Sequence, residues 1–185
     1  MKLITTILLV ACLARAGQQP ANAPTEPGAY YKTAVGFVKL EQTMMAGGGA
    51  RHVGKMFVPG LTPQLVYTFR GPHSPLQIAQ SRPTFYIRQA PYTSSILGRT
   101  ARDVVIVRFD AKKDRRELQI TSGATAFTMK AGFSTERTPP ITVSQPSVDA
   151  LTVVPTEDLK PGEYLLTFAG TAFSGWDFGI SKEEK

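Results

Sequence analysis

The segment DLKPGEYLLTF, from Asp158 to Phe168, places a Pro-Gly turn signal directly before a tyrosine and an apolar run. Leu159, Pro161, Gly162 and Tyr164 have the spacing of a corner at which a chain crosses between the two sheets of a β-sandwich. In such a corner the tyrosine ring lies across the turn, and its hydroxyl bonds a backbone group a few residues upstream. The segment therefore predicts a sandwich corner. The alternative is a plain hairpin with an exposed tyrosine.

This segment resembles the tyrosine corner of immunoglobulin-like and fibronectin type III-like domains. The resemblance implies a Greek-key sandwich, although the Cys…Trp…Cys core of true immunoglobulin domains is missing and Trp176 follows the corner instead of preceding it. A looser resemblance is to small exported bacterial proteins of unassigned function, and it implies export and a β-rich domain but no activity. It is carried by Arg82–Arg88, Arg116–Gln119, Leu159–Leu166 and Trp176–Ile180.

The rest of the chain has many turn signals between short apolar runs, and its 14 prolines and 16 glycines argue against long helices. The clearest strand is Asp103–Phe109, whose β-branched residues predict burial on both faces. We expect an all-β, antiparallel β-sandwich (immunoglobulin-like, Greek-key) of roughly eight to ten short strands. The other expected strands lie within 29–42, 52–60, 65–69, 76–79, 84–88, 117–121, 124–131, 141–144, 151–154, 163–168 and 176–180.

Between these runs the pattern predicts several connections. Three consecutive glycines favour a flexible loop at Met45–Arg51. A phosphate-binding loop is the alternative, but its GxxxxGK[ST] spacing is missing. Ala111–Glu117 is an expected polar hairpin turn, and Ser147–Leu151 and Thr156–Leu159 are expected helical turns. Trp176–Ile180 alternates apolar and polar residues, which predicts a closing strand with one buried face.

The N-terminus has the pattern of a secretory signal peptide over residues 1–16: Lys2, an apolar run, and small residues at the cut. Cys12, the only cysteine, lies in a context resembling the bacterial lipobox, so lipidation with a cut before Cys12 is the alternative. Residues 17–28, rich in proline and alanine, are an expected linker. Residues 29–185 are expected to form one domain, held together without a disulfide.

Residues that could carry chemistry are few. His52 and His73 are expected in exposed loops, and no spacing of metal ligands is visible, so we expect no metal and no cofactor. No G-x-S-x-G nucleophile elbow occurs. Asp103, Glu163 and Asp177 are conceivable carboxylates for hydrolysis, although Asp177 is expected to bind backbone donors at the last turn. The sequence therefore favours a protein that is not an enzyme.

The basic residues Lys112, Lys113, Arg115 and Arg116 form a candidate contact patch for an anionic partner. The alternative, favoured because Asp110, Asp114 and Glu117 dilute the charge, is a solvated hairpin tip that blocks edge pairing. The whole chain has a mild net charge of +7, and nucleic acid is not an expected partner of an exported chain.

Together these features predict a non-catalytic, exported β-sandwich that acts as a binding or accessory module of the bacterial cell envelope. It would lie in the periplasm or at the cell surface, anchored to the outer membrane if Cys12 is lipidated. Its expected partner is an envelope protein or a glycan, with loops and strand edges as contact surface. Two alternatives remain: a homo-oligomeric structural subunit that assembles through strand edges, and a hydrolase whose site is not visible in the sequence.

Overall fold

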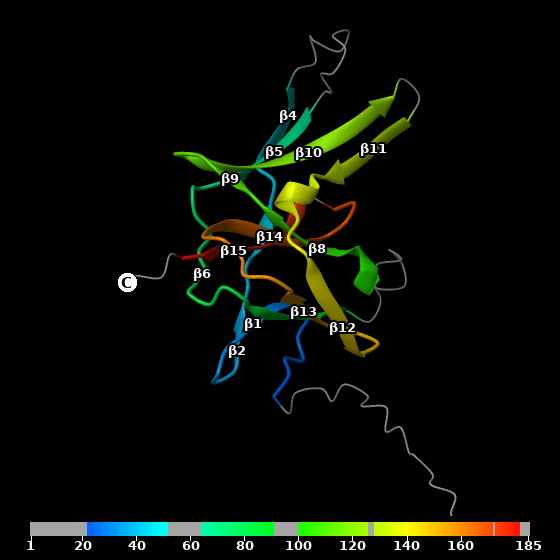
Figure 1. Cartoon of the computed structure of the whole chain (residues 1–185). Coiled ribbons are helices and arrows are strands. Elements are labelled where there is room, and N and C mark those ends of the chain that lie inside the picture. Colours follow the sequence, from blue (N-terminus) through cyan, green and yellow to red (C-terminus); the bar gives the residue numbers. More distant parts are fainter. Residues whose placement is uncertain (1–21, 52–63, 91–99, 126–127, 172, 182–185) are drawn as a thin grey trace, which may run out of the picture.

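A computed structural model describes residues 22–51, 64–90, 100–125, 128–171 and 173–181, and this part of the chain is an all-β fold of three stacked sheets (Figure 1). Its fifteen strands are paired antiparallel, apart from one short parallel ladder between β6 and β15. The described residues include no α-helix, only two 3₁₀ turns, at Ala101–Asp103 and Thr135–Arg137. The predicted all-β antiparallel sandwich is confirmed, with more strands than expected.

Sheet A forms one outer layer, in the order β12-β13-β7-β1-β2. Its centre is β7, which pairs with β1 on one side and β13 on the other. The bounds are β1 (Gly28–Lys32), β2 (Phe37–Lys39), β7 (Thr84–Arg88), β12 (Ile141–Ser147) and β13 (Ala150–Pro155).

Sheet B is the central layer, in the order β3-β15-β14-β8, with β6 added beside β15. Its strand β8 contains the unbroken apolar run Val104–Val107, and β14 is buried from Glu163 to Phe168, as expected for strands covered on both faces. The bounds are β3 (Gln42–Met44), β6 (Gln77–Ile78), β8 (Val104–Arg108), β14 (Gly162–Phe168) and β15 (Ser174–Ile180).

Sheet C forms the other outer layer, in the order β11-β10-β5-β4, with β9 paired to β10. The long strand β10 pairs with β5, β9 and β11. The bounds are β4 (Gly47–Arg51), β5 (Gln64–Arg70), β9 (Asp110–Ala111), β10 (Arg115–Thr125) and β11 (Thr128–Phe133).

Sheet B is sandwiched because alternate residues of its strands point to opposite sides. Ile106 and Leu166 belong to a large apolar core shared with sheet A, whereas Val107 and Leu165 belong to a smaller core shared with sheet C. We call these the A/B core and the B/C core. The prediction that Asp103–Phe109 is buried on both faces is confirmed. A third small cluster, around Tyr30 and Tyr86, lies on the outer side of sheet A.

The expected flexible loop at Met45–Arg51 is wrong, because Gly47–Arg51 is β4, an edge strand paired with β5. Ladder hydrogen bonds need no side chains, so a glycine run can form a strand beside bulky neighbours. A Cβ atom at Gly47 or Gly48 would lie 3.2 Å from the side chain of Thr68 or Tyr67. Glycine here leaves room for the side chains of β5.

Other local predictions also need correction. The expected strand 124–131 contains the end of β10 and the start of β11, which pair with each other. The expected helical turns at 147–151 and 156–159 are a strand junction and a bend. The expected linker 17–28 ends one residue late, because Gly28 already pairs with Arg88 in sheet A. The expected strand 52–60 lies outside the described residues.

Candidate functional site

The corner between β13 and β14 carries the chain from sheet A to sheet B. Leu159 is buried in the A/B core, and its N–H donates to Ser81 O. The hydroxyl of buried Tyr164 donates to Lys160 O at 2.6 Å, and burial raises the pKa of this phenol despite the nearby Arg108 charge and that hydrogen bond. The hydrogen bond expected from the sequence is therefore present.

Gly162 is needed at this corner for two reasons. Its φ of 152° favours glycine, and a Cβ atom there would lie 3.1 Å from Nε of Arg108. The Arg108 Nη2 donates to Pro161 O at 2.9 Å, which holds the guanidinium over the turn. The four corner residues thus form a structural joint, and Gly162 also lines a second, smaller cavity of about 430 Å³ beside Arg108 and Glu163.

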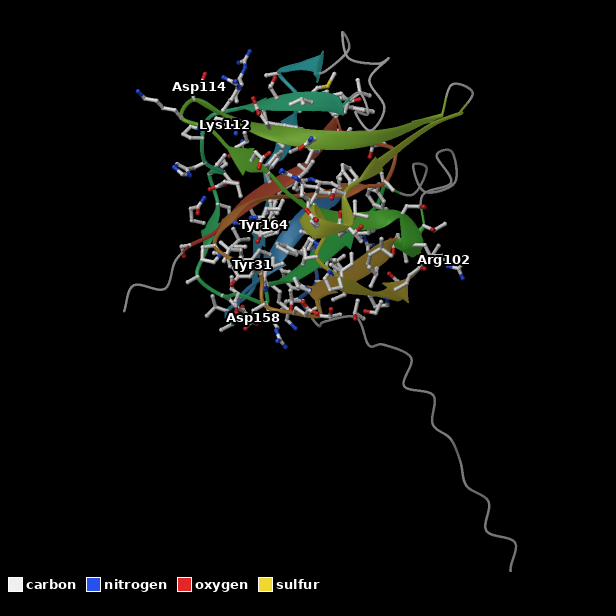
Figure 2. The ribbon with its side chains drawn as sticks, turned by 45° about the horizontal axis from the view of Figure 1, so that its top comes forward. Tyr31, Arg102, Lys112, Asp114, Asp158 and Tyr164 are labelled. Carbon is white, nitrogen blue, oxygen red and sulfur yellow. The ribbon has the colours of Figure 1, made fainter. Side chains whose placement is uncertain are left out.

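The candidate basic patch is divided by the fold. Lys112 and Lys113 are exposed with Asp114 at the tip of the β9–β10 hairpin (Figure 2). The predicted hairpin is therefore confirmed, but its turn is shorter than the expected Ala111–Glu117, because β10 begins at Arg115. Arg115 pairs with Asp114 and Glu117. Arg116 is only 2% exposed and points inward, so it cannot belong to a contact surface. The four-residue patch is therefore wrong.

Arg116 instead forms a buried ion pair with Asp177 of β15, across the interface between sheets C and B. Its Nη2 also donates to Arg70 O at 3.0 Å, and its guanidinium carbon lies 5.2 Å from the ring centroid of Phe109. Both side chains of the pair are 3% exposed. Asp177 therefore does not bind backbone donors at the last turn, and β15 is buried on both faces, contrary to the sequence pattern.

Glu163, the second candidate carboxylate, fixes a neighbouring loop. Its side chain accepts the Ser74 N–H at 2.7 Å and lies 3.0 Å from Nδ1 of the exposed His73, with the Gln77 amide at 3.3 Å. Gln77 in turn lies over Gly179, where a Cβ atom would overlap it. His73 is exposed as predicted, and its partner is a buried structural carboxylate.

Asp103, the third candidate carboxylate, closes a capping box. It accepts hydrogen bonds from the backbone N–H of Thr100 at 2.7 Å and the Thr100 hydroxyl at 2.9 Å, and these bonds lower the pKa of its carboxyl group. All three candidate carboxylates thus have structural partners. Glu163 and Asp177 lie on the neighbouring strands β14 and β15, and Asp103 lies apart from them in the 3₁₀ turn before β8. His52 and Cys12 lie outside the described residues.

A groove of about 920 Å³ opens at one end of the interface between sheets A and B. Its floor is formed by Leu40 and Ile87 of the A/B core, and its wall by Phe168 and partly buried Trp176. The two aromatic rings meet edge to face, with centroids 6.4 Å apart and planes at 68°.

Two amide side chains lie on the same side as this aromatic wall. Gln42 is the direct partner of Trp176 across β3 and β15, so both side chains leave the same face of sheet B. Gln89 follows Ile87 by two residues, so strand alternation directs it toward the A/B side. Neither amide makes a hydrogen bond within the part of the chain that the structure describes.

Both cations at the rim of the groove have carboxylate partners. Lys39 pairs with Glu26 at 3.0 Å, which raises the pKa of its ammonium group. Arg88 pairs with Asp149 at 2.8 Å, and the pKa of that carboxyl is lowered first by the Ser147 hydroxyl and also by Arg88. The groove also has the exposed Glu41 at its edge.

Sequence reasoning missed this groove, although it predicted Trp176 on a closing strand. The groove draws on β1, β2, β3, β7, β14 and β15, and no local pattern shows that these strand ends meet. One signal was the position of the only tryptophan at the start of a strand, where it is less buried than residues further along.

The described residues contain no group of three metal-ligating side chains placed to hold an ion. They also contain no helix of the length and hydropathy needed to cross a membrane. Comparison with known proteins finds no family model, no curated protein and no solved structure that matches the chain.

Proposed function

We propose that the chain is a non-catalytic binding module, exported to the bacterial envelope, and that the groove between sheets A and B is its ligand site. The observation that carries this proposal is the groove itself. It combines a concave apolar floor, a half-open aromatic wall and unpartnered amides, which is the usual composition of ligand sites. Export rests on the signal-peptide pattern of residues 1–16.

The carboxylates support the non-catalytic part of the proposal. A hydrolytic pair needs two carboxyl groups that face one substrate. Asp177 is paired with Arg116, Glu163 holds the 73–77 loop, and Asp103 caps a 3₁₀ turn. Each is committed to the fold, and none of the three lines the groove.

A photoreactive side chain in cells that make this protein tests the proposal. Benzoylphenylalanine at Glu41, an exposed groove residue, is compared with the same residue at Lys112, on the β9–β10 hairpin. Irradiation of intact cells is expected to give a covalent adduct at position 41 and none at position 112. Equal adducts at both positions, or none at 41, would contradict the groove as the ligand site.

A second candidate is a structural subunit that assembles through strand edges. Strand β4 favours it, because it forms an edge of sheet C and its first three residues, Gly47–Gly49, carry no side chain that would block pairing, although Arg51 ends the strand. Size-exclusion chromatography with light scattering distinguishes the two. A subunit elutes as a large assembly, and a binding module as a monomer or dimer.

A further inference from the structure

The inward-facing chemistry of the groove is neutral. The side chains that face the A/B side are aromatic, aliphatic and amide, and the most exposed polar groups among them belong to Gln42 and Gln89. An amide presents both donors and an acceptor, so it can bind a hydroxyl group in either sense. The two amides can therefore bind a ligand that carries several hydroxyl groups and no charge.

The two cations of the rim point away from this interior. Lys39 lies 6.0 Å from the ring centroid of Tyr30, which belongs to the cluster on the outer side of sheet A. Arg88 is two residues from Tyr86 of the same cluster, so alternation directs it outward as well. Each cation already has a carboxylate partner, Glu26 or Asp149. An anionic ligand in the groove would therefore find no unpaired cation among the described lining residues.

We infer that the ligand of this groove is a neutral oligosaccharide, whose sugar ring stacks on Trp176 while its hydroxyl groups bond Gln42 and Gln89. The C–H face of a sugar ring carries a small positive charge and complements the negative face of an indole ring. Phe168 supports Trp176 from its edge, so the ring is positioned before binding. A volume of about 920 Å³ lies near the upper end for small-ligand sites and accommodates more than one ring.

This inference rests on the proposed function, and the composition of the adduct formed at position 41 separates the two. Acid hydrolysis of the purified adduct is expected to release neutral sugars. An adduct that contains only peptide, lipid or acidic sugars would overturn the ligand class and leave the groove as a ligand site. The absence of any adduct would overturn both.

Titration of the purified full chain supplies the residue-level test. The probes are neutral hexasaccharides of glucose, mannose and N-acetylglucosamine, chosen to include the sugars found in the adduct, with hexagalacturonate as the anionic counterpart. The tryptophan fluorescence, which comes from Trp176 alone, is expected to change with a matching neutral sugar and to remain constant with hexagalacturonate. The reverse result would contradict a neutral ligand.

Two matched variants then locate the contact. Gln89→Leu removes the groove amide at nearly constant volume and is expected to weaken binding about tenfold, because it leaves a sugar hydroxyl without a partner. Gln145→Leu makes the same change on β12, outside the groove, and is expected to leave binding unchanged. Equal affinities of the two variants would overturn the assigned geometry.

Discussion

The two faces of sheet B are built differently although they share the same strands. The A/B core contains fifteen buried residues that are apolar or aromatic, and it ends in the open groove. The B/C core contains six such residues and lies beside the buried Arg116–Asp177 ion pair. A buried ion pair specifies how two layers fit together but adds little net stability. The A/B core thus supplies most of the apolar burial, whereas the B/C core has a polar contact that depends on alignment.

The largest expected effect comes from breaking the ion pair on one side only. Asp177→Leu leaves Arg116 charged and without its carboxylate in the B/C core, and it is expected to lower the free energy of unfolding by about 3–5 kcal/mol. Urea denaturation measures the change. The double variant Arg116→Met/Asp177→Leu is expected to recover most of the loss. If the double variant is as unstable as the single one, the unpaired charge of Arg116 is not the cause of the lost stability.

Neighbouring leucines on β14 compare the two faces directly. Leu165 points to the B/C core and Leu166 to the A/B core, and both are fully buried. Replacement by alanine is expected to cost about 2–5 kcal/mol in each case, because each leaves a cavity. Only Leu166 lies opposite Trp176 across β14 and β15.

Leu166→Ala is therefore expected to weaken binding of the sugar as well, since Trp176 loses support beneath it, while Leu165→Ala leaves the affinity unchanged. Urea denaturation gives the stability of each variant. Fluorescence titration at low temperature, without denaturant, gives its affinity for the sugar. Equal affinities for the two variants would show that the groove does not depend on the A/B face.

A smaller effect is expected at the corner. Tyr164→Phe removes the hydrogen bond to Lys160 O and is expected to cost about 1 kcal/mol at neutral pH. Because burial raises the pKa of Tyr164 above its usual 10.0, the folded state holds this proton more tightly than the unfolded chain does. The contribution of Tyr164 is complete below pH 10 and declines as the pH rises above it.

Denaturation at pH 8 and pH 11 measures this difference, and Tyr31→Phe is the control because Tyr31 bonds only Gln80 at the exposed surface. The gap between the parent chain and Tyr164→Phe is expected to narrow at pH 11. A gap that widens would contradict the raised pKa.

The smallest effect is expected at the hairpin tip. Lys112 and Lys113 are exposed and have no ion pair within the described part of the chain. The substitutions Lys112→Ala and Lys113→Ala are therefore each expected to change the free energy of unfolding by less than about 0.5 kcal/mol. Neither is expected to change binding of the sugar. A loss of affinity in either variant would indicate that the ligand contacts the β9–β10 hairpin and would contradict the groove as its site.

The sequence could predict what depends on local patterns. Leu159, Gly162 and Tyr164 predicted a corner, the β-branched residues of Asp103–Phe109 predicted a strand buried on both faces, and Ala111–Glu117 predicted a hairpin turn. It could not predict contacts between strands far apart. Arg116 and Asp177 are 61 residues apart, and each reads alone as an ordinary exposed charge. Only the stacking of three sheets buries them.

The groove escaped prediction for the same reason. Its residues come from six strands and the connections between them, and their proximity depends on sheet order. The three-layer arrangement was not predicted either. The apolar run Val104–Val107 indicated a strand covered on both faces, but such a run does not show which elements cover it. The glycine run was misleading for a different reason. Gly47–Gly49 favours a loop by propensity, but Gly47 and Gly48 leave space for the side chains of Thr68 and Tyr67 on β5.

The central claim is that a ligand covers Trp176 in the groove, and collisional quenching of its fluorescence by acrylamide tests this most directly. The purified chain is titrated with the neutral polysaccharide fraction of the envelope from cells that make it, and the quenching constant is followed. Because Trp176 is the only tryptophan and is partly exposed, the account predicts that quenching falls to a saturating minimum. Quenching that is unchanged at every concentration of this fraction would contradict it.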